Sequence, residues 1–369
     1  MANVPTLRFP GFTDKWEKKR VGDIAKLSKG AGISKDDRSI SGVPCILYGE
    51  LYTTYNSEII NKVVSKTELP LDNLVQSEGN DVIIPSSGES AIDISTARCI
   101  TTSGILLGGD LNIIRLKNDD GRFLSYQLNG VRKLDIAKVA QGVSVVHLYG
   151  DALKSISVSL PHIDEQKKIA DFLSLLDERI ALQSKLIDRL KSLMDGIIDK
   201  VTALTPNISI RDCLDCYSST LQECETEEQG TYPVYGANGV CGYLDYATIS
   251  APAILIVKDG SGVGNVSYAN GDCSVVGTLN YLQPKKDVSA KFLYFVLKRF
   301  NFQPYKTGMA IPHIYFKAYS KTRIFCPDYE EQTRMAASLS RIEDKIALEE
   351  RLLCLQKEQK HYLLSAMFI

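Results

Sequence analysis

Two short stretches of this 369-residue chain have residue types from which a catalytic site can be built. Glu165-Gln166-Lys167 has the E-x-K spacing of many nucleases, whereas the related stretch Glu331-Gln332-Thr333 lacks the lysine. Both stretches fall where a long helix is expected to begin, and acidic residues there stabilise the positive end of the helix dipole. Helix capping therefore explains them better than catalysis does.

Other chemically capable residues lack the partners they need. His147 and His313 occupy equivalent positions in two related stretches, but neither has an evident nucleophile for a Ser/His/Asp arrangement, so a structural role is favoured. Cys213 and Cys216 are the one close pair among nine scattered cysteines, which is a weak signal for zinc and argues against a disulfide framework. The segment KDGSGVGN at 258–265 lacks the Lys-Ser/Thr ending of a phosphate-binding loop. We predict no catalytic residue, no metal site and no cofactor in this chain.

Charge is unevenly distributed along the second half of the chain, although the net charge is only −1. Residues 204–283 carry two basic and nine acidic side chains, whereas residues 284–323 carry nine basic side chains and one acidic one, a net charge of +8. Aromatic residues interleave with this basic run. Two interpretations remain open: solvated lysines over an ordinary core, or a phosphate-contacting face that includes Lys306, Lys317, Lys321 and Arg323.

The elements that position these residues occur twice. LPHIDEQKKIADFLSLLDERIAL at 160–182 returns as CPDYEEQTRMAASLSRIEDKIAL at 326–348, displaced by 166 residues without a gap. QGVSVVHLY at 141–149 and TGMAIPHIY at 307–315 keep the same displacement. A period this long excludes a solenoid and predicts a duplicated domain.

The end of each repeat is predicted to be a long helix. In the first copy, apolar residues from Ile169 to Val201 recur at alternating steps of four and three, with Gln183 as the polar member, which is a heptad seam. The second copy keeps this seam less strictly and has Glu349 at the place of Gln183. A helix over 164–201 is roughly 57 Å long at ~1.5 Å per residue. Because a helix of this length extends beyond one small domain, it needs another segment to cover its apolar seam. We therefore expect the two helices to pack as an antiparallel coiled coil.

The segments before the helices read as mixed α and β bodies. DVIIPSSGES at 81–90 and AILIVKDGSGVG at 253–264 are each a short apolar strand followed by a Gly/Ser loop, and LNIIRL and LNYLQP are further strand candidates. The sequence thus predicts an α+β chain: body 1 over 1–160, helix 161–203, body 2 over 204–326 and helix 327–369. Since no apolar run approaches the ~20 residues of a membrane span, and the beginning of the chain is unlike a secretory signal, we expect a cytoplasmic protein without membrane contact.

Three features carry a resemblance to a known family: LRFPGFTDKWEKKRVGDIAKLSKG at 7–30, YPVYGANGVCGY at 232–243 and the paired Glu-Gln helix starts. With these features in this order and spacing, the chain resembles the DNA specificity subunits of type I restriction–modification systems. It implies two target recognition domains, each reading one half of a split site in double-stranded DNA. It also implies docking of two methyltransferase subunits and of restriction/translocase subunits. Methyl donor, ATP and Mg are then expected in the partner subunits rather than in this chain.

This resemblance turns several residues into candidate contacts. Candidates for DNA contact are Lys29, Lys35, Ser86, Ser87, Lys258, Ser261, Lys306, Lys317, Lys321 and Arg323. Candidates for docking subunits at the helix starts are Glu165, Gln166, Glu331 and Gln332. Two other hypotheses stay open: a coiled-coil scaffold that reads no DNA, and a nucleotide- or metal-dependent enzyme acting on nucleic acid.

Overall fold

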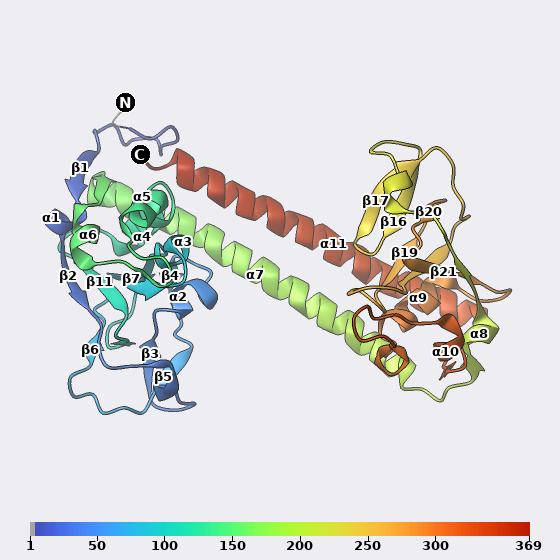
Figure 1. The fold of residues 1–369 in the computed structure, drawn as a ribbon. Helices are drawn as coiled ribbons and strands as arrows, with labels where there is room; N and C mark the ends of the chain where they lie inside the picture. Colours follow the sequence, from blue (N-terminus) through green and yellow to red (C-terminus); the bar gives the residue numbers. More distant parts are fainter. Residues whose placement is uncertain (1–3) are drawn as a thin grey trace. The chain divides into compact units, whose positions relative to one another are not determined.

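The protein, described here over residues 4–369 of a computed structural model, forms two compact units. Unit 1 contains the chain up to Gln183 together with Leu352–Ile369, and unit 2 is Ser184–Arg351. Each unit therefore holds one mixed α/β body and one half of each of two long helices, α7 (Ile163–Thr202) and α11 (Tyr329–Ala366), which are green and red in Figure 1.

The body of unit 1 is organised around a five-stranded sheet. Its order is β2 (Ala25–Lys29), β11 (Leu111–Leu116), β7 (Asp81–Pro85), β9 (Arg98–Ile100) and β4 (Ile59–Ile60). A second sheet has the order β5 (Ser65–Thr67), β3 (Val43–Ile46), β10 (Leu106–Leu107) and β6 (Val75–Gln76). Two small pairs join β1 (Glu17–Arg20) to β13 (Ser157–Leu160) and β8 (Ser87–Gly88) to β12 (Val146–His147). The helices are α1 (Val21–Ile24), α2 (Glu50–Thr53), α3 (Ala91–Ile94), α4 (Gly121–Asn129), α5 (Lys133–Val139) and α6 (Gly150–Ser155).

The body of unit 2 repeats this plan with fewer elements. Its main antiparallel sheet is β15 (Leu214–Ser218), β21 (Leu279–Pro284), β18 (Ala253–Val257) and β19 (Val266–Ala269). A three-stranded sheet is β17 (Gly239–Leu244), β16 (Tyr232–Gly236) and β20 (Ser274–Val275), and β14 (Ile208–Ser209) pairs with β22 (Arg323–Ile324). The helices are α8 (Ile210–Cys213), α9 (Ala290–Lys298) and α10 (Phe316–Tyr319). The correspondence of β2–β11–β7–β9 with β15–β21–β18–β19 is the duplication that the sequence predicts.

Local sequence explains the elements that support the later argument. The inner strands β7 (DVIIP) and β18 (AILIV) are buried at every residue, as a continuous apolar run requires when both faces of a sheet are covered. Helix α4 begins where the Asp120 carboxylate accepts hydrogen bonds from the backbone N–H groups of Arg122 and Phe123, and Ser289 caps α9 in the same way.

The long helices bury the predicted seam. Every seam residue of α7 is buried or half-buried, and most residues between them are exposed. Within unit 1, Ile169 and Leu173 of α7 share an apolar core with Leu363 and Met367 of α11. Within unit 2, Lys191 of α7 pairs with Glu350 of α11.

These pairings fix the direction of the helices. In each unit the residue numbers rise along α7 as they fall along α11, so the two halves run antiparallel. The predicted fold class, two mixed α/β bodies with two long antiparallel helices, is confirmed. The division of the sequence at 160, 203 and 326 stays a prediction, since the compact units divide each helix.

Candidate nucleic-acid interface

In unit 1 the predicted Gly/Ser loop packs against a hairpin. The residues after β7 enter β8, where Ser87 pairs with His147 of β12, and the Leu148 N–H donates to the Ser86 carbonyl oxygen at 2.9 Å. The side chains of Ser86 and Ser87 are buried. Both residues thus contact the hairpin through their backbones, Ser86 by its carbonyl oxygen and Ser87 by its pairing with His147.

Unit 2 has the same arrangement with more polar residues. The Ile314 N–H donates to the Lys258 carbonyl oxygen and the Gly260 N–H donates to the Pro312 carbonyl oxygen, each at 2.9 Å, and Asp259 forms a bridge with His313. The Lys258 ammonium lies 3.7 Å from the Asp259 carboxylate and is half-buried, whereas Ser261 is exposed. The structure therefore brings Lys258 and Ser261 beside the histidine hairpin.

The two histidines close these hairpins through their backbones. His147 exchanges backbone hydrogen bonds with Gln141 at 2.7 and 2.9 Å, and His313 does so with Thr307 at 2.8 and 2.9 Å. The His147 ring is exposed and the His313 ring is half-exposed. The structural role that the sequence favours is therefore carried by the main chain, and the imidazoles remain on the surface.

The basic run of unit 2 divides into paired and unpaired cations. Four of its side chains make ion pairs inside the unit: Lys285 with Asp215, Lys291 and Lys298 with Glu343, and Arg299 with Asp195 and Asp199. Arg323 donates to the Asn207 carbonyl oxygen at 2.6 Å. Among residues 4–369, no carboxylate lies within 4.0 Å of the ammonium groups of Lys306, Lys317 and Lys321.

The remaining basic candidates lie on the surface of unit 1. Lys29 is exposed at the end of β2, and Lys35 is exposed at the start of a 3₁₀ turn, Lys35–Asp37. Together with Lys317 and Lys321 they are exposed cations, the side-chain type that neutralises phosphates.

The glutamines of the Glu-Gln pairs at the helix starts form hydrogen bonds with residues of their own units. The Gln166 side chain accepts from the Asp120 N–H at 2.9 Å and donates to the Asp119 carboxylate at 2.8 Å, which ties α7 to the start of α4. Its counterpart Gln332 accepts from the Ser289 N–H at 2.8 Å and so ties α11 to α9. Both glutamines are buried. These repeated contacts explain why the glutamine occurs in both copies; the prediction that they dock subunits stays untested.

The two glutamates of these pairs differ. Glu165 is buried and receives two hydrogen bonds of 2.7 Å from the Arg8 guanidinium, so helix capping does not describe its carboxylate. Glu331 is half-exposed and pairs with Arg334 one turn along its own helix. Sequence reasoning missed Arg8, because nothing in the spacing relates a residue near the beginning of the chain to position 165.

A second pair of equivalent acids fastens each long helix to its body. In unit 1 the Tyr126 hydroxyl donates to Asp177 at 2.8 Å, and Lys360 of α11 pairs with both Asp177 and Glu58. In unit 2 the Tyr294 hydroxyl donates to Glu343 at 2.6 Å. Asp177 and Glu343 are related by the same displacement of 166 residues, a signal that was present in the sequence.

Glu58 in unit 1 and Glu343 in unit 2 have different electrostatic surroundings. Burial raises the pKa of Glu58 and outweighs the attraction of Lys360. Burial also acts to raise the pKa of Glu343, but the hydrogen bonds from Tyr294 and Lys291 and the charges of Lys291 and Lys298 lower it overall. The Glu343 site therefore holds a carboxylate among fixed cations.

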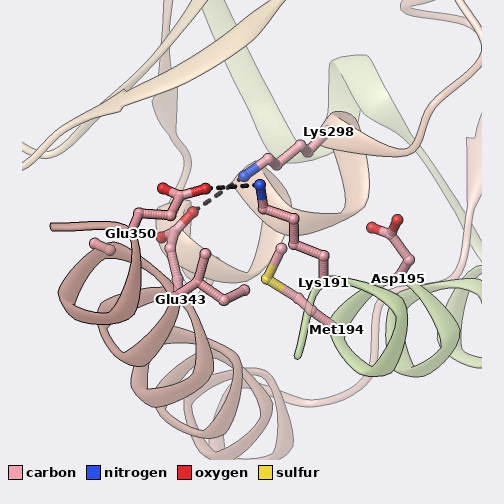
Figure 2. Close-up of a pocket in the computed structure, with 8 residues that line it drawn as sticks. Lys191, Met194, Asp195, Lys298, Glu343 and Glu350 are labelled. Carbon is pink, nitrogen blue, oxygen red and sulfur yellow. Dashed lines mark hydrogen bonds and ion pairs between the residues drawn. The ribbon is translucent and has the colours of Figure 1, made fainter. Parts of the chain in front are cut away.

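Between α7 and α11 of unit 2 lie two open grooves. Figure 2 shows the first, of about 370 Å³, where Met194 lies beneath Lys191 and Glu350, with Lys298 and Glu343 at its edge. The second, of about 360 Å³, includes Ile197, Val201, Met335 and Leu339. Apolar floors with charged rims are typical of surfaces that accept another helix.

Two features are absent from the described part of the chain. Within residues 4–369 no cluster of three or more His, Cys, Asp or Glu side chains has the geometry to hold a metal ion. Over the same residues no helix is long and apolar enough to cross a membrane.

Comparison with known proteins gives related results by sequence and by fold. The type I restriction modification DNA specificity domain matches residues 13–192 and again residues 215–354. The specificity subunit of the type I restriction enzyme MjaVIII from Methanocaldococcus jannaschii is 28% identical over 199 residues, which are 53% of this chain and 43% of that protein. The alignment thus spans less than half the length of this relative.

Two solved structures share the fold. The type I restriction–modification S subunit from M. genitalium is 18% identical, with a TM-score of 0.73 and 99% of each chain covered. A chain from a study of complex assembly and conformational transition in a type I restriction–modification system is 15% identical, with a TM-score of 0.52 and coverage of 97% of this chain and 98% of that chain. Because the same domain matches most of the sequence in two successive copies, this chain belongs to the family of type I restriction–modification DNA specificity domains.

Proposed function

We propose that this chain is the DNA-reading subunit of a type I restriction–modification complex and that each body reads one half of a bipartite site. The observation that carries the proposal is the second match of the same specificity domain on a second body with the same strand order. A duplicated framework with different surfaces suits the reading of two different half-sequences by one protein.

The bodies differ in their smaller sheets. Each smaller sheet contains a parallel pair, β3–β10 in body 1 and β16–β20 in body 2, but the flanking strands differ: the orders are β5–β3–β10–β6 and β17–β16–β20. Base sequence is read by side chains that reach base edges, and phosphate contacts set position. The exposed lysines Lys29, Lys35, Lys317 and Lys321 fit the positioning role. The sheets that differ between the bodies are our candidates for reading.

The long helices are the proposed docking surface for partner subunits. In unit 2 the grooves beside Met194 and Met335 offer apolar floors with charged rims, which suits an amphipathic helix of a methyltransferase subunit. In this proposal two methyltransferase subunits and the restriction/translocase subunits join the chain and bring the methyl donor, ATP and Mg. The chain itself supplies recognition and performs no catalytic step.

Exchange of one body tests this function. Residues 4–160 are replaced by the corresponding body of another family member, the complex is assembled with its methyltransferase, and methylated positions are mapped on random DNA. We expect one half of the bipartite site to change and the other half to stay. A complex that modifies DNA without sequence preference, or a swap that alters both halves, contradicts the proposal.

A further inference from the structure

The hairpin at 307–315 of unit 2 holds a short tip in a closely defined place. Thr307 and His313 exchange backbone hydrogen bonds of 2.8 and 2.9 Å at its base. Gly308 then turns the chain at a φ of +86°, and a Cβ atom at this glycine would overlap the Ile311 carbonyl oxygen. The residues that follow the glycine therefore form a short tip on a fixed base.

The side chains of this tip are apolar and exposed. Met309 is fully exposed, and Ile311 keeps 67% of its surface exposed. The buried residue of the hairpin is Ile314, whose N–H donates to the Lys258 carbonyl oxygen at 2.9 Å, so the anchor of the hairpin is separate from its tip. Exposed apolar side chains gathered at one place mark a binding site.

Cations flank the tip on both sides along the chain. Lys306 precedes the hairpin and Lys317 follows it, and among residues 4–369 no carboxylate lies within 4.0 Å of either ammonium group. The hairpin itself contains no Asp or Glu. A partner that suits this pattern has negative charges on its outside and apolar surfaces that can be reached between them. Duplex DNA has this arrangement, with phosphates outside and stacked base faces inside.

We propose that Met309 and Ile311 form a wedge that inserts between adjacent base pairs in the half-site read by body 2. Lys306 and Lys317 then hold the phosphates beside the opened step. Ile and Met are among the side chains that DNA-binding proteins insert to unstack a base step and kink the duplex. Because the cost of unstacking depends on the step, the wedge adds readout of DNA deformability to readout by base contacts. This inference rests on the proposed function and deepens it.

The equivalent hairpin of unit 1, residues 141–149, offers a matched comparison. Its tip exposes the smaller side chains of Val143 and Val145. The lysine that precedes it, Lys138, already pairs with Asp135 at 3.7 Å. The combination of a large apolar tip with unpaired cations on both sides thus belongs to body 2, and substitution of the two valines is the matched control.

The first test measures the kink. The full chain is assembled with the methyltransferase subunit of the same system on a duplex that carries a dye at each end, and energy transfer between the dyes reports the bend. Met309→Ser with Ile311→Ser is expected to reduce the bend by about 20° or more and to weaken the duplex affinity about tenfold. Val143→Ser with Val145→Ser should leave the bend due to body 2 in place. Urea unfolding checks that each variant is folded.

The second test measures the preference for DNA that is already distorted. A single mismatch is moved step by step through the half-site of body 2, which is the half that stays unchanged when body 1 is exchanged, and through its flanks. Since a mismatch lowers the cost of unstacking, the wild-type complex should bind about tenfold more tightly when the mismatch lies at the inserted step. Met309→Ser with Ile311→Ser should lose most of this gain. Lys317→Ala should weaken binding to all these duplexes alike and keep the gain.

The outcomes separate insertion from other roles of the hairpin. Loss of both the bend and the mismatch preference in the tip variant alone supports the inference. If the tip variant keeps either of them, or if the wild-type complex lacks either, the inference fails and the proposed function stands. A tip variant that loses a methyltransferase subunit while its DNA stays bent overturns the inference in favour of a protein contact. A wild-type complex that binds all sequences alike contradicts the proposed function itself.

Discussion

At the scale of single residues, this chain uses its charged side chains in two ways. Lys291, Lys298 and Arg299 are held by carboxylates of the long helices, whereas Lys306, Lys317 and Lys321 make no such pair within residues 4–369. A cation that already has a buried or half-buried partner gains less from a phosphate than a free one does. The candidates for DNA contact are therefore fewer than the net charge of the run indicates.

Removal of one free lysine tests this distinction. In the assembled complex, Lys317→Ala is expected to weaken binding to all DNA sequences alike and to lower the slope of log affinity against log salt by about one. Lys285→Ala is the matched control, because Lys285 pairs with Asp215 at 3.4 Å. Equal slopes for both variants and the wild type would mean that Lys317 is simply solvated.

The Glu343 ion pairs make stability depend on pH. The folded pKa of Glu343 is lowered from its ordinary value of 4.5, so its contribution is fully present above pH 4.5 and is lost as pH falls through the folded pKa. Glu343→Gln should destabilise unit 2 by about 1 kcal/mol at pH 7, a value kept small because the group is partly solvated. Urea unfolding of both proteins should show the difference at pH 7 and its disappearance in acid. A difference that grows in acid would contradict this assignment.

At the scale of elements, the repeated glutamines join the long helices to the bodies. Gln166 binds the first N–H at the start of α4, and Gln332 does so for α9, where caps already satisfy the following N–H groups. Helix starts leave several donors without intrahelical acceptors, so a buried amide supplied by a neighbouring helix satisfies one of them. This contact fixes where each long helix begins relative to its own body.

Loss of the glutamine should therefore loosen the helix start. Gln166→Ala leaves the buried Asp120 N–H without an acceptor and is expected to cost about 2 kcal/mol, and Gln332→Ala should act similarly in unit 2. The neighbouring Lys167 is exposed, so Lys167→Ala should change stability by less than about 0.5 kcal/mol. Urea midpoints and hydrogen exchange of α4 and α9 measure the effect. Equal midpoints for Gln166→Ala and Lys167→Ala would show that the contact is not stabilising.

At the scale of the whole molecule, duplication places a polar residue in the middle of each long helix. Gln183 in α7 and Glu349 in α11 occupy equivalent seam positions, and both lie at or near the limits of the compact units. If the helices determine the separation of the half-sites, lengthening them there should change the separation alone.

Insertion of four alanines after Gln183 and four after Glu349 tests this idea. Each helix lengthens by roughly 6 Å, which corresponds to about two base pairs at ~3.4 Å each, and four residues nearly preserve the seam's face. Mapping of methylated sites should give both half-sequences intact and a longer unspecified spacer, while Gln183→Ala alone should leave the spacer unchanged. Full activity on the original spacer would show that helix length does not determine it.

The sequence by itself determined the elements whose signal is local. The duplication, the helix over 164–201 and the strands LNIIRL, LNYLQP, DVIIP and AILIV follow from periodicity and apolar runs, and the structure confirms them. These features depend on residues close together along the chain, where 3.6-residue and two-residue periods act directly.

Only the tertiary structure decided which side chains remain available at the surface. The sequence predicts a loop at Ser86 and Ser87, but both are buried and Ser87 lies in a strand paired with β12. It predicts a helix cap at Glu165, but this carboxylate binds Arg8, 157 residues away. Val143 and Met309 are apolar yet fully or almost fully exposed, which residue type alone does not predict. Burial and long-range pairing result from the packing of distant segments, and no local spacing in the sequence encodes which partner a side chain will meet.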